Sequence, residues 1–406
     1  MQKKQAALSF ILFTILLDML GIGIIIPVLP KLVTTLYGSD LSHGSYIFGW
    51  FAASYALMQF IFSPILGNLS DAYGRRPIIL GSLFGAGIDY LVMAFAPTLG
   101  WLFVGRIISG ITGANITAAN AYVADVSAPE DRAKNFGMIG ACFGIGFIIG
   151  PILGGVLGYY GLKWPFIAAA ILNLCNAMYG YFILPESHPK ENRRAFDWSR
   201  VNPMASLTAL KQYPVVLGLA ATLFIERIAH DVFPSTWVLY TTYRFNWTEM
   251  DNGLSLAVVG VAFAIVSALL TGPIVAKFGE RNCLIFGLII GAVAFLLYGL
   301  ATQGWMLYAI IISSSIGGIS GPSLQAMITK LIPSNEQGAV QGALNSLQSV
   351  ATIIGPLIAT NLFGYFTSDA APVKIPGAAF LASSLLVAIA AIMAIRSSRK
   401  QALEIR

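Results

Sequence analysis

Long apolar segments recur along the whole chain and are separated by short polar stretches. A helix of about 20 apolar residues crosses the roughly 30 Å hydrocarbon layer of a membrane, and about twelve segments of this length can be counted. The pattern therefore predicts an all-α membrane protein with about twelve transmembrane helices. The predicted spans are 6–30, 46–68, 77–96, 99–124, 136–158 and 164–184 in the first half, and 213–240, 253–276, 282–301, 304–330, 339–363 and 375–395 in the second.

The second half of the sequence is a weaker copy of the first. The string GNLSDAYGRRP starts at Gly67, and GPIVAKFGERN starts at Gly272, almost half the chain length of 406 residues later. The same offset places Gly150 on Gly355. Several matches at one offset indicate an internal duplication.

A polar segment separates the two copies. Residues 185–212 mix Pro, Glu, Lys, Arg and Asn, a composition that suits a linker between domains. We therefore predict an N-terminal six-helix bundle at 1–184 and a pseudo-symmetric C-terminal six-helix bundle at 213–406. Repeated bundles of membrane helices are typical of transporters, so the repeat indicates transport.

Composition and charge suit lipid rather than water. Hydrophobic residues make up 57% of the chain and charged residues 10%, against roughly 25% charged residues in soluble domains. The mean hydropathy is +0.76. Most Lys and Arg residues fall on one side of the predicted spans, which by the positive-inside rule predicts both termini in the cytoplasm. The net charge of +6 then reflects loop anchors, and we expect no nucleic-acid partner.

Enzyme and receptor functions are not favoured. The three histidines are scattered, and neither an HExxH motif nor a GxxxxGK[ST] nucleotide-binding string occurs. Cys142, Cys175 and Cys283 lack the paired spacing of metal or disulfide sites. No soluble signalling domain is predicted. We therefore expect neither an enzyme nor a receptor, and no bound metal or cofactor.

Three ionisable residues lie inside predicted spans of the first half. Asp18 and Asp89 fall near the middle of the first and third spans, and Arg106 falls in the fourth. Each costs about 2.5–3.5 kcal/mol on insertion scales, so each needs a function or a partner. Because burial favours the protonated form of a carboxyl group, we predict that these residues couple protons to transport. The alternative is a fixed ion pair between Asp18 and Arg106.

The seventh span carries four charged or titratable residues. Glu226 precedes His230 by four positions, and Arg227 precedes Asp231 by four, so each pair can meet on one helix face. Pro234 follows and predicts a kink, because proline removes a backbone hydrogen bond. The pairs either neutralise one another, or Glu226, His230 and Asp231 form a second proton-coupling site, since histidine titrates near neutral pH.

Two motifs carry a resemblance to a known family. GNLSDAYGRRP resembles the loop signature of the major facilitator superfamily, and GIGFIIGPILGG (Gly144–Gly155) resembles the fifth-helix motif of its drug/proton antiporters. LLDMLGIGIIIPVLP (Leu16–Pro30) and AYVADVSAPEDRAKNFG (Ala121–Gly137) are similar to the tetracycline/proton antiporter family. The resemblance implies the major facilitator fold, a central cavity, and export driven by inward proton flow.

The resemblance also implies gating residues in the two motifs. Asp71 would pair with the start of the eleventh helix, near Gly342, and Arg75 with Asp125. For the loop motif, the alternative is a turn that is only anchored by solvated charges. For the fifth-helix motif, the alternative is helix packing alone. The gating candidates are Gly67, Asp71, Gly74, Arg75, Arg76, Asp125, Gly146, Gly150, Pro151, Gly154 and Gly155.

One departure from the family concerns an acid in the ninth helix. The family commonly has an aspartate there, whereas Gly291 stands in that place here. His230 with Glu226 or Asp231 is then a replacement for that acid. Polar and aromatic residues that either line a cavity or anchor membrane interfaces are Gln59, Asn115, Asn120, Trp237, Tyr240 and Gln325.

The expected function is proton-coupled efflux of a small amphipathic drug-like compound or metabolite, tetracycline-like compounds included, by alternating access. Proton-coupled uptake by a symporter of the same fold is the alternative. The expected partners are a small-molecule substrate, protons and the lipid bilayer. We expect a monomer in a bacterial inner membrane.

Overall fold

The computed structural model describes residues 2–38, 40–128, 131–198, 201–202, 210, 212–333 and 336–404. Across these ranges the regular structure is helical, and no β-strand occurs. Eleven of the described helical segments are long and apolar enough to cross a membrane. This is the architecture of a multi-pass membrane protein.

The chain divides into two compact units. Unit 1 comprises 1–38, 54–203 and 248–257, and unit 2 comprises 39–53, 204–247 and 258–406. Two of the boundaries between the units fall inside helices, one in α3 (Leu41–Tyr73) and one in α11 (Glu249–Ile265), so each of these helices contributes residues to both units. The bundles expected at 1–184 and 213–406 stay a prediction.

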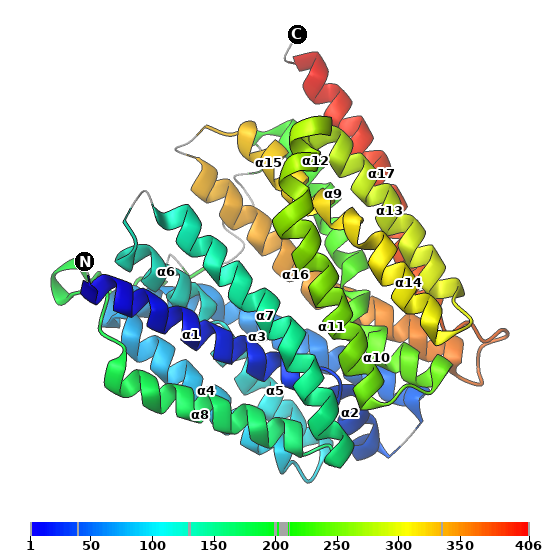
Figure 1. Cartoon of the computed structure of the whole chain (residues 1–406), viewed down its shortest axis with the longest axis horizontal. Coiled ribbons are helices and arrows are strands. Elements are labelled where there is room, and N and C mark those ends of the chain that lie inside the picture. The colour runs from blue at the N-terminus through cyan, green and yellow to red at the C-terminus, as the bar shows by residue number, and fades with distance from the viewer. Residues whose placement is uncertain are drawn as a thin grey trace. The chain divides into compact units, whose positions relative to one another are not determined.

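Unit 1 is built around the first, third and fifth predicted spans. Within it α1 lies along α7 and α8, and α4 packs against α5 and α8 (Figure 1). The apolar side chains of α1 and α4 form a core with those of α6. Besides its part of α3 and α11, unit 1 contains α1 (Gln2–Ile25), α2 (Leu29–Tyr37), α4 (Arg75–Ala94), α5 (Leu99–Gly113), α6 (Ile116–Val126), α7 (Arg132–Tyr160) and α8 (Trp164–Ile183).

Unit 2 packs around a long C-terminal helix. Within it α17 contacts α9 and α13, α16 contacts α9 and α10, and α15 contacts α13. Besides its part of α3 and α11, unit 2 contains α9 (Pro214–His230), α10 (Val232–Phe245), α12 (Thr271–Phe278), α13 (Glu280–Leu300), α14 (Gly304–Ser314), α15 (Ser320–Lys330), α16 (Gln337–Thr367) and α17 (Ala378–Glu404). It also has a π-helical turn η5 (Val266–Leu270) and a 3-10 turn η6 (Ser315–Ile319).

Several predicted spans are interrupted among the described residues, and two of the breaks lie next to site candidates. The span expected at 99–124 is formed by α5 and α6, with a turn at Ala114 and Asn115. The span expected at 213–240 is formed by α9 and α10, which are separated at Asp231. Pro234 explains this break, because it has no N–H to offer the carbonyl of His230. The predicted kink therefore occurs three residues before the proline itself.

The duplication is visible in the backbone. Gly74, between α3 and α4, has φ +106° and ψ +156°, and Gly279, between α12 and α13, has φ +77° and ψ +154°. The two glycines are equivalent under the sequence repeat. Positive φ is a conformation that glycine adopts without the steric cost other residues meet, so both copies of the turn keep the residue that their shape requires.

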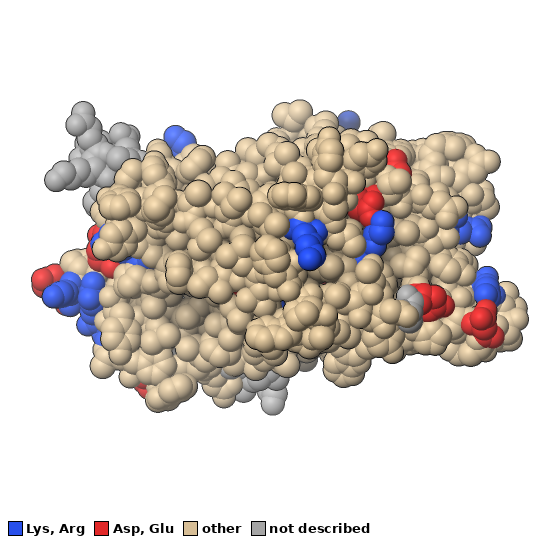
Figure 2. All heavy atoms as spheres, turned by 90° about the horizontal axis from the view of Figure 1, so that it is seen from below, with Lys and Arg blue, Asp and Glu red and all other residues tan. Residues whose placement is uncertain are grey.

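The surface carries many large apolar side chains. Phe182 and Tyr159 are each 77% exposed, and on the face shown in Figure 2 most of the surface belongs to neither Lys, Arg, Asp nor Glu. A soluble protein rarely exposes so large an apolar area. Such a surface is suited to contact with lipid chains.

Candidate functional site

Both membrane carboxylates of unit 1 are buried. Asp89 on α4 is fully buried and accepts a hydrogen bond from the Ser109 hydroxyl on α5. Asp18 on α1 is 9% exposed and accepts a hydrogen bond from the Asn115 amide at 3.5 Å. Asn115 lies in the turn between α5 and α6, so the interruption of the fourth span brings a polar side chain to Asp18.

The Asp89 carboxylate is only partly satisfied. Its Oδ1 atom is buried and has no hydrogen-bond partner. Room for this atom comes from Gly105, where an added Cβ would lie 3.0 Å from Oδ1 and 2.6 Å from Met93 Cγ. A buried acceptor without a donor is costly, whereas a proton on the carboxyl group would remove its charge. The geometry is therefore suited to a carboxyl group that takes up and releases a proton.

Arg106 lies on α5 in the same region of unit 1. Its guanidinium stacks over the Tyr55 ring of α3, with 4.1 Å between Cζ and the ring centroid. Such a contact stabilises a cation in a poorly solvated place. Arg106 also interacts electrostatically with Asp89. A role for Arg106 in proton coupling stays a prediction.

The unit 1 candidates for substrate contact differ in their surroundings. Gln59 donates from Nε2 to the Gly113 carbonyl at 3.1 Å, at the end of α5. Asn115 is buried and donates its amide hydrogen bond to Asp18. Asn120 is partly buried on α6. Contact of these residues with a substrate stays a prediction.

The loop motif between α3 and α4 is organised by Arg75. Its side chain forms an ion pair with Asp71, reaches Asp125 Oδ2 at 3.3 Å from Nε, and donates to the Ser70 hydroxyl at 2.6 Å. The backbone N–H of Arg75 donates to Glu186 Oε1 at 2.9 Å. The pairing of Arg75 with Asp125 that the resemblance implied is thus present. Pairing of Asp71 with the start of α16 stays a prediction.

The other residues of this motif fix the turn to its neighbours. Arg76 donates to the Tyr181 carbonyl at the end of α8 and lies over the Tyr181 ring. Gly67 packs close to Thr117, with 3.1 Å between an added Cβ and Cγ2. Gly74 provides the positive φ described above. A latch role for these residues remains a prediction.

The glycines of α7 allow close helix packing on one face. An added Cβ at Gly150 would lie 2.7 Å from Gly23 Cα, and one at Gly154 would overlap the Ile24 carbonyl oxygen. Gly146 similarly faces Met19. These positions are four residues apart, which places them on one helix face. They form the surface against which α1 lies.

The same motif packs on the first turns of α11. An added Cβ at Gly155 would lie 2.7 Å from the Glu249 carbonyl, and one at Gly253 would overlap the Pro151 carbonyl. Glu249 also forms an ion pair with Lys31 on α2. Sequence analysis did not identify this pair, because neither residue lies in a motif or in the middle of a predicted span.

The charged residues of α9 pair as their spacing predicted. His230 Nδ1 lies 3.6 Å from Glu226 Oε1, and Arg227 Nη2 lies 3.4 Å from Asp231 Oδ1. Arg227 also donates to the Thr352 hydroxyl of α16 at 3.3 Å. The Asp231 side chain is 2% exposed, and its Oδ2 has no hydrogen-bond partner. Arg227 and Asp231 thus neutralise each other, whereas Glu226 and His230 do so only when His230 is protonated, and a proton-coupling role for these residues stays a prediction.

Unit 2 contains a cavity of about 330 Å³ beside α9. Glu226 and His230 line it, together with Gly291 of α13. The position of the acid missing from α13 therefore faces the same space as a carboxylate from α9. The sequence predicted that His230 with Glu226 replaces the missing acid. The structure places these side chains and Gly291 around the same cavity, as such a replacement requires.

The aromatic candidates of unit 2 lie in packed surroundings. Trp237 is 1% exposed and contacts Phe233, Tyr298 and Phe380, and the Tyr240 hydroxyl donates to the Tyr298 carbonyl at 2.7 Å. Neither residue lines the cavity. The remaining candidate, Gln325 on α15, donates from Nε2 to the Gln341 side chain of α16.

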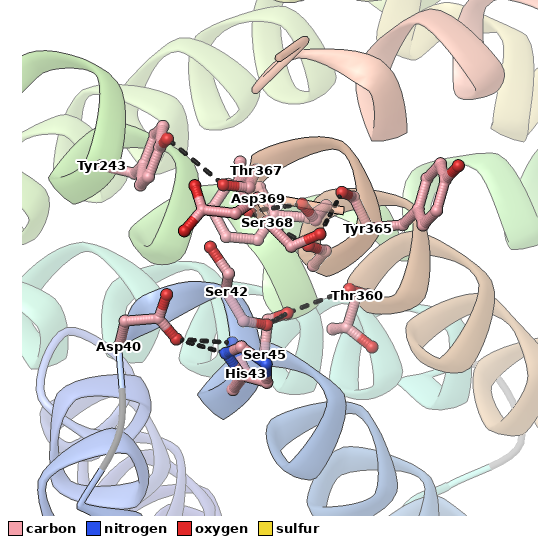
Figure 3. A network of polar contacts seen from close by, with 12 residues as sticks. Asp40, Ser42, His43, Ser45, Tyr243, Thr360, Tyr365, Thr367, Ser368 and Asp369 are labelled. Atoms are coloured by element: carbon pink, nitrogen blue, oxygen red, sulfur yellow. Dashed lines mark hydrogen bonds and ion pairs between the residues drawn. The ribbon is translucent and has the colours of Figure 1, made fainter. Parts of the chain in front are cut away.

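A further polar network joins the start of α3 to the end of α16 in unit 2 (Figure 3). Ser45 donates to the Thr360 carbonyl at 3.1 Å, and His43 binds Asp40 at 2.7 Å between Nδ1 and Oδ1. The His43 ring and the His43 backbone N–H both hydrogen-bond to Asp40. Both contacts hold the pKa of Asp40, which precedes α3, below its ordinary value. Sequence analysis missed this network, because serine and threonine contacts leave no spacing signal.

Comparison with known proteins finds one matching family and relatives that cover most of the chain. The model of the Major Facilitator Superfamily matches residues 11–356 and 219–404. The tetracycline resistance protein of class C from Escherichia coli is 44% identical over 361 residues, covering 89% of this chain and 90% of that protein. The class G protein from Vibrio anguillarum is 42% identical, with 86% and 88% covered.

Solved structures agree with the fold. An inward-facing, occupied bacterial homologue of the human lysosomal transporter Spinster has a TM-score of 0.79 at 14% identity, covering 98% of this chain and 97% of that one. The nucleoside transporter NupG gives 0.77 at 12% identity, covering 96% and 98%. At these identities the likeness concerns the fold alone.

Proposed function

This chain belongs to the Major Facilitator Superfamily, and from that membership we propose that it exports a small amphipathic compound of the tetracycline type by alternating access. The observation that carries the proposal is the 44% identity to a tetracycline resistance protein over nine-tenths of both chains. Uptake by a symporter is not favoured, since the relatives are named for resistance.

The energy source that we propose is the inward flow of protons. Asp89 and Asp18 are the proton carriers, because both are buried and Asp89 Oδ1 has no hydrogen-bond donor. Ser109 holds the other Asp89 oxygen in place, and Asn115 orients Asp18. Arg106 lies close enough to act on the charge of Asp89. A cation arriving beside Asp18 or Asp89 would favour the ionised carboxylate and so release the proton.

The Arg75 cluster supports a gating role for the loop motif. Arg75 is held by Asp71, Asp125 and Ser70 at once, which ties the turn before α4 to the end of α6. Charged hydrogen bonds of this kind contribute about 1.5–3 kcal/mol each. We propose that the cluster stabilises one of the two access states.

The proposed location is a bacterial inner membrane with both termini in the cytoplasm. The support is the distribution of cations along the sequence, in which the helix ends that carry Arg75, Arg76, Arg132, Lys277 and Arg281 fall on one side of the predicted spans. By the positive-inside rule these ends face the cytoplasm. We further propose that the protein acts as a monomer without a cofactor.

The proposal is tested with purified protein in lipid vesicles. With a pH gradient imposed, tetracycline should move against its own gradient in the direction opposite to the protons. Vesicles without protein supply the control for leakage. Movement of the same speed and extent after an ionophore has collapsed the pH gradient would overturn proton coupling.

A second experiment addresses His230. If the Glu226–His230 pair is a proton-coupling site, binding of tetracycline to purified protein should release protons, and His230→Ala should reduce that release. The change in pH of a weakly buffered solution measures it. His43→Ala is the matched control, because His43 is an exposed histidine in the first turn of α3 and does not line the cavity of unit 2. Equal release from wild type and His230→Ala would remove His230 from the coupling scheme.

A further inference from the structure

We propose that the cavity of unit 2 is a binding site for a small aromatic organic cation, with Glu226 as its charge partner. The inference rests on the proposed export function and names a ligand class for one site within it. The volume of about 330 Å³ lies at the lower end of the roughly 300–1,000 Å³ found for ligand pockets. The cavity therefore has room for a ligand of a few fused or linked rings.

The charge of the cavity points to a cation. Among the described residues that line it, Glu226 is the one that carries a carboxylate, no Lys or Arg is present, and His230 is charged only when protonated. The Glu226 side chain is 16% exposed. A carboxylate in such surroundings is costly unless a proton or a positive charge accompanies it. A bound cation would supply that charge.

The walls point to an aromatic ligand rather than a metal ion. Phe233, Phe295 and Tyr298 form one wall, with ring centroids 5.3 Å apart for Phe233 and Phe295 and 5.5 Å apart for Phe233 and Tyr298. Phe295 also meets the His230 ring edge to face at 5.2 Å. Ring faces attract organic cations. No group of three metal-ligating side chains occurs among the described residues.

Small residues also line the cavity. Gly291 and Gly321 line the cavity, and at Gly291 an added Cβ would make an ordinary 3.6 Å contact with Val387. A larger side chain at Gly291 would therefore fill the cavity without forcing the backbone apart. Gly287 differs, because an added Cβ there would lie 2.7 Å from the Gly317 carbonyl. Gly291 is thus a position at which a larger side chain can block the cavity without a backbone clash.

The test compares two probes of similar shape and different charge. N-methylquinolinium is a planar aromatic cation, and quinoline in mildly alkaline buffer is its uncharged counterpart. Binding to the full-length protein is measured by equilibrium dialysis against empty detergent micelles. Wild type should bind the cation at least about tenfold more tightly than quinoline.

Three variants assign this preference to the cavity. Glu226→Gln should weaken cation binding about tenfold and leave quinoline binding unchanged, and Gly291→Leu should weaken binding of both probes. Glu280→Gln is the matched control, because Glu280 is a carboxylate of unit 2 that pairs with Lys330 outside the cavity. Elution volume and helical circular dichroism show which variants are folded. If Glu226→Gln is misfolded, the two-probe comparison in wild type and Gly291→Leu still decides.

Each outcome has a fixed meaning. Equal binding of both probes by wild type, or cation binding unaffected by Glu226→Gln or by Gly291→Leu, overturns the inference and leaves the cavity to an uncharged occupant such as a lipid chain. Proton-coupled tetracycline export is measured separately in vesicles. Export by a wild type that shows no cation preference contradicts the site alone, whereas a Glu226-dependent preference without proton coupling contradicts the proposed function alone.

Discussion

Asp89→Asn is expected to abolish proton-driven export of tetracycline, because an amide cannot carry the proton that the carboxylate exchanges. The variant should still fold, since asparagine has nearly the same shape and its carbonyl oxygen can accept the Ser109 hydrogen bond. Uptake into vesicles with an imposed pH gradient should fall to the level of vesicles without protein. Downhill movement of tetracycline measures whether the variant still binds and transports.

The matched control for this variant is Asp131→Asn, a change of the same chemistry in the exposed turn before α7. Export by this protein should equal that of wild type. If Asp89→Asn still accumulates tetracycline at the wild-type rate under a pH gradient, Asp89 does not carry the coupled proton. Asp18 would then be the remaining carboxylate of the unit 1 site.

Gly154→Ala should strongly destabilise the protein, although it adds only one methyl group. The new Cβ would overlap the Ile24 carbonyl oxygen, so α1 and α7 would have to move apart along their shared face. Overpacking of this kind typically costs about 1–3 kcal/mol and occasionally more. We expect a lower thermal unfolding midpoint for the purified protein and a smaller yield of folded protein.

The same helix offers the control. An added Cβ at Gly144 would meet no atom within 4 Å, so Gly144→Ala should be neutral or should stabilise α7 by up to about 1 kcal/mol through helix propensity. Equal unfolding midpoints for Gly154→Ala and Gly144→Ala would show that the α1–α7 contact is not tight. The glycine motif would then need an explanation other than packing.

Those parts of the structure that depend on local pattern were predictable. The apolar runs located the membrane segments, because the length of a spanning helix is set by the thickness of the membrane. The pairs of α9 followed from helix geometry, which places residues four apart on one face. The contact between Arg75 and Asp125 was predictable only through the resemblance, since nothing in their spacing brings them together.

Features that depend on packing between distant segments could not be predicted. Hydropathy does not register a break in a helix, so the turn at Asn115 was missed, and the break at Asp231 was predicted only because Pro234 follows it. Ser109 leaves no charge or spacing signal, and its hydrogen bond to Asp89 depends on the packing of α4 on α5. The cavity beside Glu226 needs α9, α13 and α15 together, which no single segment reveals.

The matching glycine turns at Gly74 and Gly279 bear on how the two copies diverged. Both turns keep positive φ and nearly equal ψ, yet Asp71 of the first copy corresponds to Ala276 in the second. Both copies therefore keep the bend but differ in their ion pairs, Arg75 with Asp71 and Asp125 in the first and Glu280 with Lys330 in the second. An acidic residue introduced at Ala276 would lie four positions before Glu280, where the first copy has Arg75, and would meet a like charge, so the two halves share a bend and differ in the sign of the charge beside it.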